Sequence, residues 1–172
     1  SIRDVKGTCY ICDVTQTPLT GAECPSYENV VGSKKEYAVS CRIQQDEQDF
    51  FRGRAVRQRH GSRMLVQNQP AIPLSQEELD EVYALPYMRT YHPMYEAEGG
   101  VPGIEEVRFS IAHNRGCFGG CNFCSLAFHQ GRYITTRSKE SIVNEAKILT
   151  SLPDFKGYIH DIGGPTANFR RP

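Results

Sequence analysis

The 172-residue sequence lacks any apolar run close to the roughly 20 residues that a membrane-spanning helix needs. It also lacks a signal peptide, an internal repeat and a low-complexity segment. Net charge is absent too, because 20 basic side chains balance 20 acidic ones. Residues 1–100 hold 11 basic and 14 acidic side chains and the remainder holds 9 and 6. A gradient this shallow argues against a nucleic-acid surface, and the missing apolar run excludes a membrane protein.

The remaining composition is that of a globular protein, with 39% hydrophobic and 23% charged residues. Seven cysteines are the outlying number. Their odd count and uneven clustering, without a secretory signal, argue against a disulfide framework. They predict reduced thiols in a cytoplasmic protein.

Residues 1–105 are predicted to form a mixed α+β region, the first of two domains. Alternating apolar residues and turn signals predict its strands at 6–12, 54–58 and 63–67. Capping residues and apolar periodicity predict its helices at 27–45 and from Ser75 to Pro86. The longer helix is expected to bury Val30, Tyr37 and Cys41. The stretch 91–103, with its prolines and glycines, is expected to be a linker.

A different pattern begins at Val107. Period-two alternation predicts a strand over 107–112, and a second strand is predicted over 157–162. Between them lies a helix that Ser138 is expected to cap, with an apolar stripe of Ile142, Val143, Ala146 and Leu149. Strand, long crossover and strand form a βαβ unit, so the strands should be parallel and the crossover right-handed. The predicted fold class is α/β.

The most specific motif is RGCFGGCNFC, which spaces Cys117, Cys121 and Cys124 as C-x3-C-x2-C. Thiolates this close on a glycine-rich loop can converge on one soft metal centre. A structural zinc site usually takes four ligands from two separated pairs, and no cysteine follows Cys124. Three ligands to a four-iron cluster leave one iron open, which suits a catalytic centre. Buried core thiols are the alternative reading.

This motif, with Phe123 before its last cysteine and a predicted parallel strand before it, resembles the radical S-adenosylmethionine (radical SAM) superfamily. The flanking strings HNRGCFGGCNFCSLAFHQGRYITTRSKESI and GYIHDIGGPTANF resemble its YgiQ-type subgroup. GTCYIC, EQDFFRG and LPYMRTYHP, further upstream, do so as well. The resemblance covers most of the chain. It implies that residues 106–172 begin the superfamily's partial barrel with its first βαβ unit.

The resemblance also implies a site. Cys117, Cys121 and Cys124 would ligate a 4Fe–4S cluster, and SAM would chelate the fourth iron. An electron from an external donor, passed through the cluster, would cleave SAM to a 5′-deoxyadenosyl radical. Phe123 would lie by the adenine. Gly163 and Gly164 would meet the SAM amino group, although Pro165-Thr166 replaces the usual acidic residue and an ordinary strand-ending turn is the alternative.

Arginines near the loop could pair with the anionic cluster or the SAM carboxylate. Arg137, directly before the Ser138 cap, is well placed for this, although exposed arginines are common at helix starts; the others are Arg115 and Arg132. His113 and His129 bracket the loop and could donate to it or serve only as satisfied or solvent-facing side chains.

The other four cysteines could complete a zinc site or form a redox pair, but buried structural thiols are the better interpretation; they are Cys9, Cys12, Cys24 and Cys41. The chain starts at Ser1 and holds a single βαβ crossover, so we expect it to be an inactive part of a longer enzyme. A non-catalytic module that holds zinc or an electron-transfer cluster is the alternative function.

Overall fold

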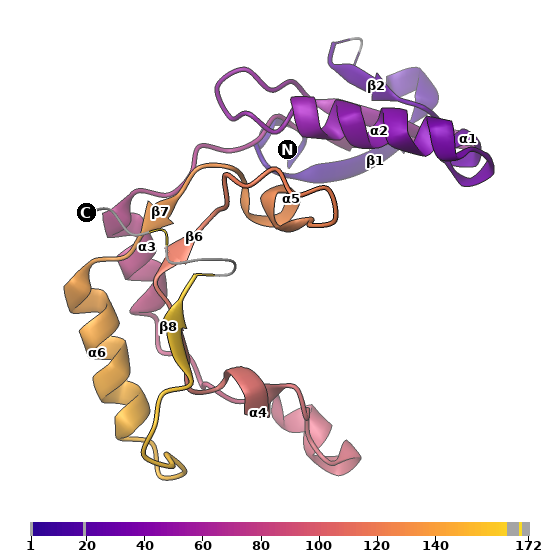
Figure 1. The fold of residues 1–172 in the computed structure, drawn as a ribbon. Coiled ribbons are helices and arrows are strands. Elements are labelled where there is room, and N and C mark those ends of the chain that lie inside the picture. The colour runs from indigo at the N-terminus through magenta and orange to yellow at the C-terminus, as the bar shows by residue number, and fades with distance from the viewer. Residues whose placement is uncertain (1, 19, 165–168, 170–172) are drawn as a thin grey trace. The chain divides into compact units, whose positions relative to one another are not determined.

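The computed structural model describes residues 2–18, 20–164 and 169. They form two compact units, Ser1–Pro73 and Leu74–Pro172 (Figure 1). This division precedes the predicted boundary at 105/106. The predicted boundary marks the residue at which the barrel should begin. A division into compact units does not test that position, so it stays a prediction.

The first unit is a four-stranded sheet with two helices. The strand order in this sheet is β1-β4-β3-β2. Strands β2 and β3 pair in parallel, whereas β1 with β4 and β4 with β3 pair antiparallel. The strands are β1 Cys9–Asp13, β2 Ala22–Cys24, β3 Val56–His60 and β4 Arg63–Gln67. The helices are α1 Tyr27–Gly32 and α2 Lys34–Asp46, with 3-10 turns η1 Ile2–Asp4 and η2 Val14–Gln16. The predicted hairpin and first strand are confirmed within a few residues, and the three-residue β2 was not predicted.

The single helix predicted over 27–45 is wrong, because it is interrupted at Ser33. Ser33 has extended backbone angles, φ −146° and ψ 118°, and its hydroxyl accepts the Glu36 N–H at 3.4 Å. A glycine followed by a serine ends one helix and caps the next. Of the three side chains expected to be buried, Val30 and Cys41 are half-buried and Tyr37 is exposed, whereas Ser40 is buried.

The two cysteines of β1 lie on opposite faces of the sheet. Residues three apart in a strand point to opposite sides, and Cys9 is exposed whereas Cys12 is buried with Met64 and Val66. They therefore cannot chelate one metal as a pair. Burial of Cys12 and Cys24 fits the expected structural role, and exposure of Cys9 does not.

The second unit begins with α3 Gln76–Tyr83, which opens with the predicted capping box. The Ser75 hydroxyl accepts the Glu78 N–H at 3.2 Å, and the Glu78 carboxylate accepts the Ser75 N–H at 2.8 Å. The predicted linker contains the 3-10 helix η3 Pro93–Glu98 and leads to α4 Ile104–Val107. A strand beginning at Val107 is therefore a wrong prediction: Val107 ends α4 and is exposed.

The predicted parallel βαβ pair is confirmed. Strand β5 Ser110–Ala112 pairs in parallel with β8 Asp161–Gly163, with Ile111 opposite Ile162. The second strand begins at Asp161, later than the predicted start at 157. Helix α6 Lys139–Thr150 lies on the crossover between them, and Ser138 caps it by accepting the Ser141 N–H at 3.1 Å. The crossover also carries three short elements that sequence reasoning missed: β6 Asn114–Arg115, α5 Leu126–Gln130 and β7 Thr135–Thr136.

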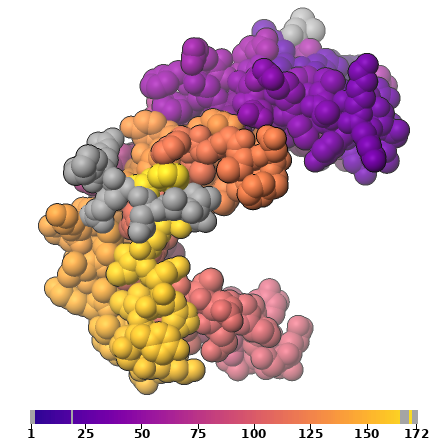
Figure 2. All heavy atoms as spheres, in the orientation of Figure 1, coloured from indigo at the N-terminus to yellow at the C-terminus, as the bar shows by residue number. Residues whose placement is uncertain are grey.

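One hydrophobic core holds α6 against β5. Ile111 and Leu149 are almost fully buried there with Phe109 and Ile142. The segment that follows α6 adds Leu152, Phe155 and Ile159 to this core. Figure 2 shows the yellow C-terminal part of the chain beside the orange helix. The predicted stripe of α6 is correct except for Val143, half of whose surface is exposed.

None of the helices in the described ranges is long and apolar enough to cross a membrane. This agrees with the absence of a long apolar run in the sequence.

Exchanging each cysteine of β1 for serine should have different effects on stability, because the two side chains lie on opposite faces of the sheet. We expect Cys12→Ser to lower the free energy of unfolding by roughly 1–3 kcal/mol, since a polar hydroxyl would replace the thiol beside Met64 and Val66, with the Thr17 hydroxyl 3.9 Å from the present sulfur. Cys9→Ser, on the exposed face, should change it by less than about 0.5 kcal/mol. Urea unfolding of both variants measures the difference, and equal effects would contradict this assignment of faces.

Candidate functional site

The three clustered cysteines lie on a loop that is closed at its base. We call residues 117–130 the cysteine loop, and its neck the antiparallel pair of β6 and β7 with Gly116 and Gly131. Asn114 pairs with Thr136 and Arg115 with Thr135. Above this pair, the Cys117 N–H donates to the Gly131 carbonyl at 3.0 Å. The pairing of β6 with β7 and the bond between Cys117 and Gly131 therefore hold the two ends of the cysteine loop together.

Gly116 makes the tight neck possible. Its φ is +91°, and a Cβ atom built on it would lie 1.9 Å from the carbonyl oxygen of Tyr133. Its N–H donates to the Gln130 side chain at 3.2 Å. Only glycine allows both this backbone conformation and this approach of two segments.

Gly119 lies between two of the three sulfurs. A Cβ atom on Gly119 would be 3.3 Å from Cys117 Sγ and 3.8 Å from Cys121 Sγ. Its N–H donates to Cys117 Sγ at 3.4 Å. Amide donors aimed at sulfur stabilise thiolate and tune iron–sulfur centres. Gly120, its neighbour, would have open space around a Cβ atom.

The third cysteine is joined to the others through the backbone. The Cys124 N–H donates to the Cys121 carbonyl at 3.2 Å. Cys117 is buried, Cys124 is half-buried and Cys121 is exposed. Among residues 2–18, 20–164 and 169, no three His, Cys, Asp or Glu side chains are arranged to hold a metal ion. The donor set and the approach of Cys117 Sγ and Cys121 Sγ to Gly119 fit an iron–sulfur cluster.

The glycine pair lies at the same edge of the parallel strands as the cysteine loop. Gly163 ends β8 opposite Ala112, which ends β5, and the Gly163 carbonyl accepts the His113 N–H at 2.9 Å. Carboxyl ends of parallel strands form the common binding edge of α/β folds. Gly163 is therefore part of the strand, with Gly164 directly after it. Pro165 and Thr166, which replace the expected acidic residue, lie outside the described residues.

Phe123, expected beside the adenine, is 93% exposed on the cysteine loop. It is thus open to a ligand, and its proposed contact stays a prediction. Phe118, also on this loop, packs against Phe169 with tilted rings whose centroids are 4.4 Å apart. His129 is exposed on α5, whereas His113 is buried at the end of β5.

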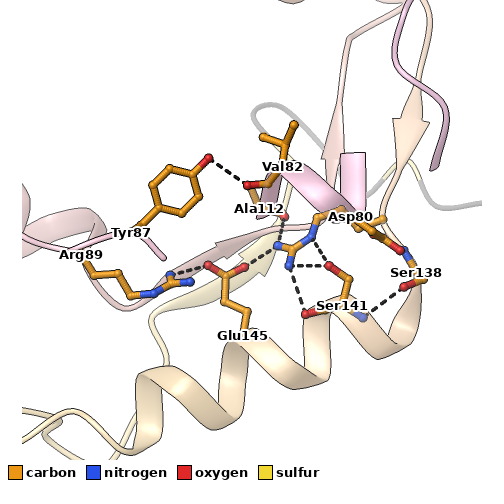
Figure 3. Close-up of polar contacts among 9 residues, drawn as sticks. Asp80, Val82, Tyr87, Arg89, Ala112, Ser138, Ser141 and Glu145 are labelled. Atoms are coloured by element: carbon orange, nitrogen blue, oxygen red, sulfur yellow. Dashed lines mark hydrogen bonds and ion pairs between the residues drawn. The ribbon is translucent and has the colours of Figure 1, made fainter. Parts of the chain in front are cut away.

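The arginines near the loop differ in their hydrogen-bond partners, although Arg115 and Arg137 both lie over the Tyr83 ring. Arg132 donates to the Gly119 carbonyl at 3.5 Å and so reaches the cysteine loop. Arg115 lies over the Tyr83 ring. Arg137 is 2% exposed and directs its guanidinium at Ala112, Ser141 and Glu145 (Figure 3). A direct contact between Arg137 and a cofactor is not among these and stays a prediction.

The partners of Arg137 are the functional residues that sequence reasoning missed. Glu145 is buried and also binds Arg89, with 2.6 Å between Arg89 Nη1 and Glu145 Oε1. A signal was present: Glu145 follows Ile142 by three positions and precedes Leu149 by four, so it lies on the apolar stripe of α6. A carboxylate on that face requires a buried cation.

Comparison with known proteins agrees with the resemblance stated above. Residues 1–110 match the family described as Radical SAM N-terminal, a match that ends before the three cysteines. A "UPF0313 protein" of Clostridium botulinum (strain ATCC 19397 / Type A) is 59% identical over 170 residues, 99% of this chain and 26% of that protein. A "UPF0313 protein" of Clostridium perfringens (strain ATCC 13124) is 55% identical over 172 residues, again 99% and 26%.

The chain thus spans about a quarter of the length of these relatives. No solved structure matches it. None of these matches identifies the YgiQ-type subgroup, which stays a prediction. Because the family match covers more than half of the chain, this protein belongs to the Radical SAM N-terminal family.

Proposed function

We propose that this chain carries the cluster-binding loop of a radical SAM enzyme. Cys117, Cys121 and Cys124 hold three irons of a 4Fe–4S cluster, and SAM binds the fourth. When bound, these groups supply reductive cleavage of SAM to a 5′-deoxyadenosyl radical, using an electron from an external donor. The observation that carries the proposal is the position of Gly119 between two cysteine sulfurs, on a loop at the edge where Gly163 ends β8.

The chain's own residues then have distinct tasks. The three thiolates bind iron, and the Gly119 N–H stabilises the charge on Cys117. Gly163 and Gly164 leave a backbone edge without side chains, which the SAM amino group can approach. Phe123 offers an exposed ring on which adenine can stack. Arg132, on the Gly119 carbonyl, brings a positive charge to the loop that binds the anionic cluster.

Each of the three cysteines should be required for the cluster. We expect Cys117→Ala, Cys121→Ala and Cys124→Ala each to remove most bound iron after anaerobic reconstitution, because a missing ligand opens an iron to solvent. Cys9→Ala, an exposed cysteine of the first unit, is the matched control and should keep the wild-type iron content. Iron per folded protein and the visible charge-transfer band, before and after SAM is added, measure the effect.

Two outcomes would contradict this proposal. Full iron content in any of the three variants would remove that residue from the ligand set. A colourless wild-type protein that binds zinc instead of iron would favour the non-catalytic metal module.

The two neighbouring glycines of the loop should respond differently to alanine. Gly119→Ala places a methyl group between Cys117 Sγ and Cys121 Sγ, so we expect about 10-fold weaker iron binding, as for other groups that surround metal ligands. Gly120→Ala places its methyl group in open space and is the matched control. Iron titration of both variants with a competing chelator measures the difference. Equal iron binding by the two variants would show that the sulfurs do not converge around Gly119.

A further inference from the structure

Arg137 is a buried cation whose hydrogen-bonding capacity is fully used. Its guanidinium donates to the Ala112 carbonyl at 2.9 Å, to the Ser141 hydroxyl at 2.9 and 3.1 Å, and to the Ser141 carbonyl at 3.1 Å. It also forms an ion pair with Glu145. These contacts engage all the N–H groups that an arginine side chain carries. Each of these donors therefore has an acceptor within the protein.

The two strand ends that Arg137 joins are the base of the cysteine loop. Ala112 ends β5, and its carbonyl accepts from the Arg137 side chain. The next carbonyl, that of His113, accepts the Arg137 backbone N–H at 2.9 Å. Arg137 itself follows β7 directly. Arg137 thus binds the two consecutive carbonyls of Ala112 and His113, where the chain leaves β5 for the loop. Because Arg137 directly follows β7, the same contacts also fix the end of the returning segment.

The positive charge of Arg137 is balanced by Glu145, a residue of α6. Figure 3 shows Glu145 between two guanidinium groups, with one oxygen on Arg137 and the other on Arg89. The Tyr83 ring of α3 covers the Arg137 guanidinium, 3.9 Å from the ring centroid. A buried cation without its partner is strongly unfavourable, so Glu145 keeps Arg137 in place.

Arg89 shows that this ion pair also holds a strained segment. It is the one non-glycine residue with positive φ, 53°, in the part of the chain that the structure describes. Such a conformation persists where the surrounding contacts determine it. Residues 76–89, which precede the predicted barrel, therefore cover and neutralise the anchor of the cysteine loop.

We propose that Arg137 is a positioning residue that sets the geometry of the cysteine loop through the carbonyls of Ala112 and His113, with Glu145 as its counter-ion. The effect of Arg137 on the cluster rests on the proposed function. Its effect on the neck rests on the contacts described above alone. Lysine in its place keeps the charge but lacks the planar fork that reaches Ala112, Ser141 and Glu145 at once.

The test compares Arg137→Lys with two controls in the full chain. Leu149→Ala removes a fully buried side chain from the α6 core and lowers stability without touching the neck. Arg108→Lys makes the same exchange in an ion pair with Asp154, before the opposite end of β5. Melting temperatures identify conditions in which every variant is folded.

The first readout needs no cluster. Hydrogen exchange at two amides reports the contacts on either side of β6. The His113 N–H donates to the Gly163 carbonyl, where the chain leaves β5, and the Cys117 N–H donates to the Gly131 carbonyl in the neck. We expect exchange at both to accelerate at least about 10-fold in Arg137→Lys and to stay near wild type in both controls. Unchanged exchange in Arg137→Lys, or equal acceleration in Leu149→Ala, would overturn the proposal.

The second readout is the electron paramagnetic resonance signal of the reduced, reconstituted cluster. We expect its change on adding SAM to be diminished in Arg137→Lys and retained in Leu149→Ala and Arg108→Lys. If wild-type protein assembles no cluster, the proposed function fails while the exchange measurement still decides the positioning role. Should the lysine variant not fold, Ser141→Ala removes the hydroxyl acceptor, leaves the ion pair and is judged by the same two readouts.

Discussion

The ion pair of Arg137 with Glu145 is the interaction on which the second unit depends. A guanidinium buried beside a strand end can be held only by a buried acid and by carbonyls that need donors. Glu145 provides the acid from the inward face of α6, and Ala112 provides the carbonyl at the end of β5. The helix, the strand and the base of the cysteine loop are thereby joined by one buried group of polar contacts.

The cysteine loop, in contrast to its buried base, is largely open to solvent. Gly116 allows close backbone approach, Gly131 adopts a positive φ of 79°, and Gly119 leaves room beside two sulfurs. The exposure of Cys121 and Phe123 leaves the loop open to a ligand. A rigid base and an open loop suit a site that must accept both a cluster and a small molecule. In such a site the thiols are brought together by the metal that they bind, because binding and ordering are coupled.

Local rules predicted much of this fold from the sequence. The serine caps at Ser75 and Ser138 follow from signals within a few residues. The parallel pairing of β5 with β8 follows from the order of strand, helical crossover and strand. The break at Ser33 was missed because the apolar stripe continued across it. The two-residue strands β6 and β7 could not be predicted, since strands that short carry no periodicity and form by pairing over a long loop. The cysteines were found from their spacing, whereas the pairing of Glu145 with Arg89 and Arg137 depends on segments far apart in the sequence.

The central claim is that Cys117, Cys121 and Cys124 bind a cluster with one open iron that SAM completes. Mössbauer spectroscopy of protein reconstituted with ⁵⁷Fe tests this most directly, because it reports each iron separately. The account predicts that adding SAM changes the isomer shift of one iron and leaves the other three nearly unchanged. A cluster whose irons all stay unchanged with SAM, or a protein that takes up no iron under anaerobic conditions, would contradict it.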